Sequence, residues 1–257
     1  MEVCYKKRNH PLKGDVIKID MDGDGVKESY LVLKTESNDV LQCLARTNVS
    51  GDNISFGPNN RYNGSNADIF CNSTWYNRLS SVAKAAIVDT TITQYSYKYV
   101  TEVYDSNTHA SYADMTSQQI KEEGLVRHAY ILGVQDIEEY FNHTFSQNDL
   151  CNFINTTSGI FWLRSGNGAA TSTAAVWALA TYNYKFLSTS MASDNVRHVR
   201  PAFKIDISQI EYSFDDGRSD IELVSVLTTQ KIISNSTASQ KAVLVSQKDI
   251  LDGGDSE

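Results

Sequence analysis

The residues best suited to do chemistry are four acids in one short, glycine-containing segment. They are Asp20, Asp22, Asp24 and Glu28. They occupy positions one, three, five and nine of a stretch with Gly25 at position six, which matches the first part of a calcium loop. Position twelve is Leu31, where an EF-hand needs a bidentate glutamate, and the segment joins strands rather than helices. A calcium loop closed by Glu28 and a solvated Asp-Gly turn both remain open.

Two arginines lie inside apolar segments, and they are the next candidates for a chemical role. Arg164 and Arg200 could each receive an anion or a carboxylate through a bidentate guanidinium. Alternatively, each is a partly buried arginine that ties the sheet to loops, with its stem packed on Trp162 or Phe203. Their position within apolar strands favours this structural role.

The segment 166–198 between these arginines is almost without charge and is rich in small polar residues. Six of its residues are candidate ligand contacts: Asn167, Trp177, Tyr182, Asn183, Tyr184 and Asn195. Evolved binding surfaces combine rigid aromatic side chains with adaptable Ser, Gly and Asn, and Trp177 or Tyr184 could stack on a sugar ring. The alternative is a polar hairpin with one face buried. We expect a recognition surface here, with the loop 48–66 as a further contributor.

Catalysis finds little support. The five histidines are dispersed, and none has the spacing of a metal site or a triad. Asp136, Glu138 and Glu139 fall on the polar face of an expected helix, where acids in the first turn complement the helix dipole. We therefore expect that the protein is not an enzyme.

Short apolar and alternating segments predict the strands that must position these residues. The main ones are 16–19, 30–34, 40–45, 94–99, 129–132, 161–165, 176–184 and 199–207. In 94–99 the tyrosines at 95, 97 and 99 alternate with polar residues, which predicts a half-buried strand. An apolar stripe predicts a helix over 75–87, capped by Ser73 or Thr74, and a second short helix covers 134–141. A capping-box pattern at 116–119 indicates a further helical turn.

The composition limits the classes of function. The 257 residues carry a net charge of -8, which argues against a nucleic-acid partner. No apolar run is long enough to insert into a membrane, and the N-terminus shows no apolar secretory signal. We therefore expect folding in a bacterial cytoplasm. The four cysteines Cys4, Cys43, Cys71 and Cys151 have no zinc or disulfide spacing, and we expect all of them to be free and structural.

The order of the apolar segments resembles a bacterial and phage domain family of unassigned function, defined by a terminal WLRS…VRPAF pattern. The matching segments are 14–17, 30–33, Trp75 with Leu79, 84–87, 130–134, 161–165 and 199–207, within residues 12–208. That family looks like a branch of the C-type-lectin-like fold, in which a mixed sheet and two helices hold ligand-binding loops. The triplets of the calcium-dependent lectin sugar site are absent from this sequence, as is the C-terminal cysteine pair of formylglycine-generating enzymes.

Resemblance and pattern together predict an α+β, C-type-lectin-like domain over residues 1–208, with a mixed, mainly antiparallel sheet, two short helices and long loops. Residues 209–257 are expected to be a C-terminal extension that cannot form its own core and could be an anchoring arm.

The resemblance implies a non-catalytic binding or adhesion module, displayed on a bacteriophage particle or a bacterial surface, that recognises a glycan or a protein through loops. The alternative is a structural virion protein, such as a capsid decoration, neck or baseplate component. The expected partners are virion proteins or a host-surface glycan or protein, and a homo-oligomer is possible. The expected location is the virion. No cofactor is required on this interpretation, and calcium is a possible ligand.

Overall fold

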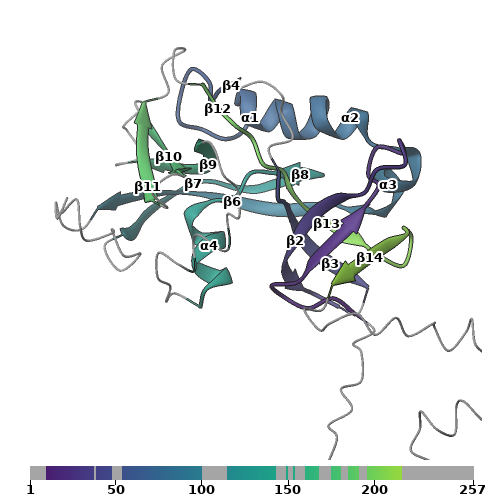
Figure 1. The fold of residues 1–257 in the computed structure, drawn as a ribbon. Coiled ribbons are helices and arrows are strands. Elements are labelled where there is room, and N and C mark those ends of the chain that lie inside the picture. Colours follow the sequence, from purple (N-terminus) through teal and green to yellow (C-terminus); the bar gives the residue numbers. More distant parts are fainter. Residues whose placement is uncertain are drawn as a thin grey trace, which may run out of the picture. The chain divides into compact units, whose positions relative to one another are not determined.

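Two main β-sheets and several short helices make up the part of the chain that the computed structural model describes (Figure 1). The described residues are 10–37, 39–47, 54–99, 115–142, 149, 153, 160–167, 175–180, 185–190 and 196–215. They form an α+β arrangement with mainly antiparallel strands, which confirms the predicted class. None of the described helices is long and apolar enough to span a membrane.

The larger sheet has the strand order β14-β1-β2-β3-β13-β5, and β8 also pairs with β13. Its strands are β1 (Val16–Ile19), β2 (Glu28–Thr35), β3 (Val40–Ala45), β5 (Ile87–Val88), β8 (Ala129–Tyr130), β13 (Ala202–Asp206) and β14 (Tyr212–Asp215). The described pairings in this sheet are all antiparallel. Its core side includes Tyr30 and Phe203, whose rings meet edge to face at 5.3 Å. Phe203 also lies 5.2 Å from Trp75, so a helix covers this face of the sheet.

The smaller sheet has the order β11-β10-β9-β6-β7. Its strands are β6 (Thr90–Tyr99), β7 (Met115–Arg127), β9 (Ile160–Asn167), β10 (Ala175–Ala180) and β11 (Lys185–Ser190). β6 and β9 run parallel, while the other neighbours are antiparallel, so the sheet is mixed. A separate pair, β4 (Ile54–Ser55) with β12 (Val196–Arg197), lies beside it, and Trp162 of β9 donates its indole N–H to the carbonyl of Ile54 at 2.8 Å.

The helices are more numerous than the two that the sequence predicts. They are α1 (Asn66–Ile69), η1 (Phe70–Trp75), α2 (Tyr76–Arg78), α3 (Ser81–Ala86) and α4 (Val134–Tyr140). The first three follow one another without a break, and η1 is a π-helix. They lie in line across the molecule in Figure 1.

The single helix predicted over 75–87 starts too late and misses a break, although its predicted end agrees with the end of α3 at Ala86. Ser65 begins α1, because its hydroxyl accepts the backbone N–H of Asp68 at 3.1 Å. Leu79 has extended backbone angles and ends α2, and Ser80 then starts α3 by accepting the N–H of Ala83 at 3.1 Å. The apolar stripe was continuous in sequence, but two serine caps outside the predicted cap positions set the true boundaries.

The interior strand β6 is half-buried, as expected, but it buries the polar face of the predicted pattern. Gln94 and Ser96 are buried, whereas Thr93 and Tyr95 on the other face are partly exposed. Tyr97 follows a register shift and is also buried. The helical turn predicted at 116–119 is wrong, since these residues belong to β7 and pair with β6, for example Lys98 with Thr116. Pairing with a neighbouring strand outweighs the local capping pattern here.

The described part of the expected surface loop, residues 54–66, places some of its side chains in the core and leaves others exposed. Phe56 and Tyr62 are fully buried. The Tyr62 hydroxyl accepts the backbone N–H of Ile131 at 3.2 Å, and its own N–H donates to Gln94 at 3.0 Å. The aromatic residues in this stretch fasten it to the strands, while Asn59, Arg61 and Asn63 are exposed, and its role in recognition stays a prediction.

Strand β14 follows residue 208, the expected end of the domain, and adds an edge strand to the larger sheet. Its four residues pair in antiparallel register with the four residues of β1. The rings of Tyr212 and Phe214 stack at 6.3 Å and pack against the core. Residues 216–257 lie outside the described residues.

A truncation series tests this boundary. A chain that ends at Gly217 keeps the complete sheet, and we expect it to melt at the temperature of the full chain. A chain that ends at Ser208 lacks β14, and four lost cross-strand pairs should reduce the free energy of unfolding by about 2 kcal/mol. Differential scanning calorimetry should then show a melting temperature lower by roughly 4–8 °C. Equal melting temperatures for the two truncations would contradict a contribution from β14.

Candidate functional site

A buried arginine joins the strand β9 to three other elements. Each nitrogen of the Arg164 guanidinium donates a hydrogen bond: Nε to the carbonyl of Thr93 at 3.1 Å, and Nη1 to the carbonyl of Ile131 at 2.9 Å. Nη1 and Nη2 also bind the two carboxylate oxygens of Asp136, the second at 2.9 Å. The guanidinium carbon lies 5.4 Å from the centre of the Tyr130 ring. The side chain of Arg164 thus connects β9 to β6, to the backbone at Ile131 and to α4.

The geometry excludes an anion receptor at Arg164, since all of its nitrogens are occupied and the residue is 2% exposed. Burial lowers the pKa of Arg164, but the charge of Asp136 and its hydrogen bonds outweigh burial and hold the pKa above the usual value. The structural alternative for this arginine is confirmed, although its ring contact is with Tyr130 rather than with Trp162. A buried pair of this kind needs its remaining donors satisfied, as they are here.

Arg200 is also buried, with 1% of its surface exposed, and its guanidinium carbon lies 4.7 Å from the centre of the Phe161 ring. Burial, followed by repulsion from Arg46, lowers the pKa of Arg200 to about 10. The burial and the ring contact agree with the expected structural role, and the ring beneath the guanidinium is that of Phe161.

Further buried hydrogen bonds fix the strands around Arg164. The amide of Gln94 donates to the carbonyls of Asn60 at 2.7 Å and of Arg164 at 2.6 Å. The Ser165 hydroxyl accepts the N–H of Val134 at the start of α4 at 2.9 Å. These bonds cross between β6, β9, α4 and the segment before α1, so the middle of the smaller sheet is held by polar contacts as well as by packing.

Five strand termini lie at one end of this sheet. They are the ends of β6, β9 and β11 and the starts of β7 and β10: Tyr99, Asn167, Ser190, Met115 and Ala175. The pairing register sets this, because β6 runs parallel to β9 while β7 and β10 run antiparallel to their neighbours. The chain connections 100–114, 168–174 and 191–195 therefore attach at the same end of the sheet, which we call the presenting end.

The predicted ligand contacts do not all attach at the presenting end. Asn167 is the last residue of β9 and lies there, whereas Trp177 lies within β10 and pairs with Ser188. The predicted residues Tyr182, Asn183, Tyr184 and Asn195 lie outside the described residues. The strand ends that flank 181–184, Ala180 and Lys185, are at the opposite end of the sheet.

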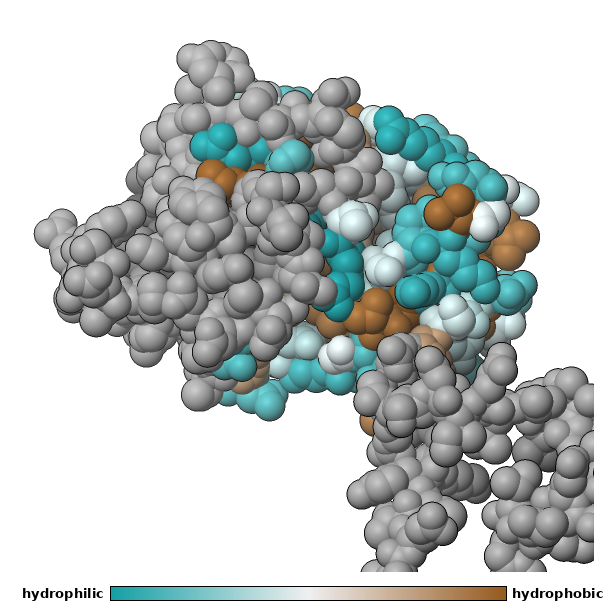
Figure 2. Space-filling model, in the orientation of Figure 1, coloured by the Kyte–Doolittle hydropathy of each residue, from teal (hydrophilic) through white to brown (hydrophobic). Residues whose placement is uncertain are grey.

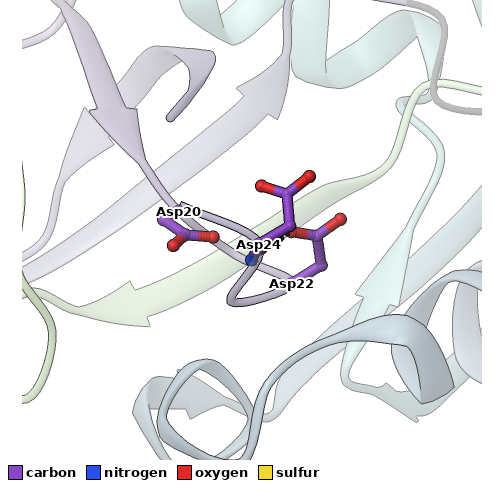
Figure 3. Close-up of side chains that lie close together, drawn as sticks. All are labelled: Asp20, Asp22 and Asp24. Atoms are coloured by element: carbon purple, nitrogen blue, oxygen red, sulfur yellow. Dashed lines mark hydrogen bonds between the residues drawn. The ribbon is translucent and has the colours of Figure 1, made fainter. Parts of the chain in front are cut away.

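The predicted acidic loop joins β1 to β2, and it brings three of its four acids together (Figure 3). The carboxylates of Asp20, Asp22 and Asp24 lie within 4.8 Å of one another. Each also accepts a backbone N–H of the loop, among them that of Gly23 on Asp20 at 2.7 Å. Three carboxylates suit a calcium ion. The same hydrogen bonds are those expected of a solvated Asp-Gly turn, so the loop geometry does not choose between the two predicted roles.

Glu28 stands apart from this trio and has a distinct electrostatic environment. Its carboxylate accepts the N–H of Met21 at 3.3 Å. Burial raises the pKa of Glu28, backbone hydrogen bonds from Met21 and from Glu28 itself partly offset this rise, and the charges of Asp22 and Asp24 add a smaller increase. The loop thus places Glu28 near the negative charges of Asp22 and Asp24. Among the described residues, no lysine or arginine forms an ion pair with any of these three acids.

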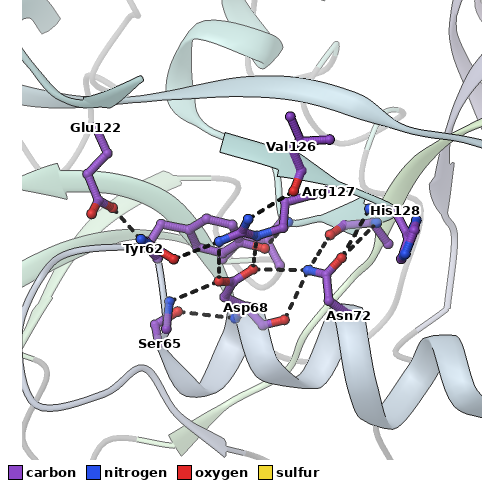
Figure 4. Close-up of polar contacts among 12 residues, drawn as sticks. Tyr62, Ser65, Asp68, Asn72, Glu122, Val126, Arg127 and His128 are labelled. Carbon is purple, nitrogen blue, oxygen red and sulfur yellow. Dashed lines mark hydrogen bonds and ion pairs between the residues drawn. The ribbon is translucent and has the colours of Figure 1, made fainter. Parts of the chain in front are cut away.

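Sequence reasoning missed a polar network where α1 meets the end of β7 (Figure 4). Asp68 binds Arg127 through both carboxylate oxygens, at 2.7 and 2.8 Å, and also accepts a hydrogen bond from Asn72 at 3.0 Å. Asn72 in turn accepts the backbone N–H of His128 at 3.1 Å. The residues come from distant parts of the sequence, and no local spacing would have revealed them. The hydrogen bonds of the Asp68 carboxylate link α1 to the end of β7. We therefore assign this network a structural role.

One imidazole beside this network is held by a carboxylate. His128 Nδ1 lies 2.5 Å from Asp89, and the ring stacks on Tyr76 at 4.3 Å. An imidazole oriented by an aspartate is one component of proton-transfer sites. No hydroxyl or thiol among the described side chains hydrogen-bonds to this histidine, and an oriented imidazole alone does not make a catalytic site.

The surface and the thiols add no further candidate. Large exposed apolar residues in the described part of the chain are Leu12, Val26, Ile69, Val82, Val88, Ile120 and Val126. On the face shown in Figure 2, hydrophobic residues form separate patches among hydrophilic ones. Cys43 and Cys71 are free and fully buried, as predicted, and burial raises the pKa of both thiols. Cys4 and Cys151 lie outside the described residues.

The fold and these contacts define an α+β protein with a polar-braced mixed sheet, and one comparison assigns its family. The family described as a domain of unknown function (DUF6273) matches residues 30–207. This is more than half of the chain, so the chain belongs to that family. Membership of a family without an assigned function is thus confirmed, while the WLRS…VRPAF signature and the phage origin stay predictions. No curated protein and no solved structure matches the chain.

The buried pair predicts a large effect of single substitutions. Arg164→Met leaves the Asp136 carboxylate without its cation, and we expect the free energy of unfolding to decrease by about 3–5 kcal/mol. Combining it with Asp136→Asn should cost less than the sum of the two single changes, because no buried charge then remains unpaired. Urea unfolding of the four proteins measures this cycle. A loss below about 1 kcal/mol for Arg164→Met would show that the arginine is not a structural centre.

The raised pKa of Glu28 predicts a pH dependence. The folded state binds this proton more tightly than the unfolded state, so stability is lost as pH rises from about 4.3, the value of a free glutamate, through the raised pKa. Glu28→Gln removes this loss, and we expect it to stabilise the protein at neutral pH and to have little effect near pH 4. Melting temperatures across this range measure the difference. Glu123→Gln on β7 is the matched control, and an equal pH dependence in both variants would refute the assignment.

Proposed function

We propose that the chain is a C-type-lectin-like, non-catalytic binding or adhesion module, displayed on a bacteriophage particle or a bacterial surface. It recognises a glycan or a protein through the connections of the smaller sheet. The observation that supports this most is the presenting end, where five strand termini lie together on a sheet braced by Arg164, Asp136 and Gln94. Binding residues are commonly carried on connections that a rigid scaffold positions.

The sequences that attach at the presenting end support recognition. The connections 100–114, 168–174 and 191–195 contain mainly Ser, Thr, Asn, Asp, Ala and Gly, together with Tyr104 and Tyr112. This mixture of adaptable polar residues and aromatic rings is that of evolved binding surfaces. The braced strands reduce the ordering cost of binding, since the points of attachment are already fixed.

The ligand that fits this arrangement is extended. Asn167 ends β9 beside the start of β10, and the segment 181–184 follows the other end of β10, which has six residues. At about 3.3 Å per residue, these ends are roughly 17 Å apart. An oligosaccharide or a protein surface spans this length, whereas a single sugar does not.

A binding screen with two sets of substitutions tests the proposal. The folded full chain is applied to a glycan array and to intact Gram-positive cells, and bound ligands are then measured with the variants. The first variant carries Asn167→Ala and Trp177→Ala, and the second replaces Tyr182, Asn183 and Tyr184 by alanine. We expect each variant to weaken binding by at least about tenfold, which corresponds to a loss of about 1.4 kcal/mol. Lys18→Ala on the larger sheet should leave binding unchanged.

The outcomes separate the interpretations. Binding that persists with a chelator is expected, because no cofactor is required. Loss in only one of the two sets would contradict an extended ligand, and no binding to any glycan or cell by a folded protein would count against adhesion. Exclusive binding to particle proteins would instead favour the structural virion protein.

A further inference from the structure

A pocket of about 270 Å³ lies on the larger sheet, between the acidic loop and the end of η1. Its floor is apolar and buried, formed largely by Met21, Tyr30, Trp75 and Leu79. Its walls carry Asp22 and Glu28 from the loop and β2, and Arg78 from α2. A pocket of this volume is smaller than the sites of drug-sized ligands and suits a molecule the size of one sugar or one amino acid.

The walls of the pocket are preformed. The Met21 carbonyl accepts the N–H of Ser80 at 2.9 Å, and this bond fastens the acidic loop to the junction of α2 and α3. Gly23 has a φ of +84° and approaches this junction so closely that a Cβ there would lie 3.3 Å from the Ser80 side chain. The rings of Tyr30 and Trp75 are both held against Phe203. A ligand therefore meets fixed groups and need not order them.

The charge of the pocket selects the ligand. Asp22 and Glu28 place two carboxylates on one side, with Asp20 and Asp24 next to them in the same loop, against the single cation of Arg78. Partial burial is the main cause of the raised pKa of Glu28, and the charges of Asp22 and Asp24 add a smaller contribution. A pocket lined by both aromatic residues and carboxylates suits an organic cation, because negative charge and ring electrons both attract a cation.

We propose that this pocket binds a small ligand through a primary ammonium group. The ammonium lies between Asp22 and Glu28 above the Tyr30 and Trp75 floor, and the polar remainder of the ligand reaches Arg78 and the hydroxyl of Thr47. Ligands of this chemistry include an amino sugar and the side chain of a lysine. The pocket is formed by the larger sheet and its helices, so its assignment does not depend on recognition at the presenting end of the smaller sheet.

Two-dimensional amide NMR of the full chain tests the site with matched probes. D-Glucosamine carries an ammonium where D-glucose carries a hydroxyl, and Nα-acetyl-lysine presents the same group on a peptide-like side chain. At about pH 6.5 we expect glucosamine or acetyl-lysine to shift the resonances of Glu28, Tyr30 and the Trp75 indole, with a Kd on the order of 1 mM. Glucose should leave them in place. The probe that binds more tightly identifies the source of the ammonium.

Two variants make the assignment specific. Asp22→Asn and Glu28→Gln keep the shape and the hydrogen-bond acceptors of the walls, and we expect each to weaken binding of the ammonium probe by at least about tenfold. Glu123→Gln should leave it unchanged. Asp22 is exposed on the loop, so its variant stays informative if Glu28→Gln alters the fold. Equal shifts with glucosamine and glucose, unchanged binding by both variants, or displacement of the probe by CaCl2 at the same resonances would overturn the proposal.

Discussion

The structure depends on satisfying one buried guanidinium. Arg164 lies in the interior of a strand, where an unpaired cation would be severely unfavourable, and Asp136 supplies the opposite charge. Asp136 has a second task, because it also accepts the N–H of Gly133 at 2.7 Å and so starts α4. One carboxylate therefore fixes the helix origin, the strand and the turn at Ile131 together. Arg164 also donates to the carbonyl of Thr93, which brings β6 into the same arrangement.

This arrangement explains why the smaller sheet can serve as a support for binding. Polar contacts are directional, so they fix the register of β6 and β9 more narrowly than apolar packing alone. Gln94 extends this bracing to the segment that precedes α1. The strand ends at Tyr99, Asn167 and Ala175 are consequently set relative to one another before any ligand arrives. The acidic pocket of the larger sheet follows the same principle, with its loop fastened to Ser80.

The sequence predicted the features that depend on local pattern. Apolar context predicted the mainly antiparallel strands and the burial of Arg164 and Arg200. Short spacing predicted that Asp20, Asp22 and Asp24 lie close together. The structure contains all of these features.

Features that depend on distant contacts could not be predicted in the same way. Gln94 is polar and alternates with tyrosines, yet it is buried because carbonyls from Asn60 and Arg164 receive its amide. Residues 116–119 carry a helix-capping pattern but pair with β6. The helix break at Ser80 follows from its bond to Met21 in another element. The separation of the predicted contacts to opposite ends of β10 arises from topology, which the amino-acid pattern does not contain.

The most direct measurement of the central claim is hydrogen–deuterium exchange of the full chain with and without the ligand or surface that it binds. The account predicts that new protection appears at both ends of the smaller sheet, in peptides that include Asn167 and Ala175 and in peptides that include Ala180 and Lys185, while amides around Arg164 and Val134 are protected in both states. Protection confined to β1, β2 and β13, or rapid exchange at Arg164 in the free protein, would contradict a braced sheet whose connections carry the ligand contacts.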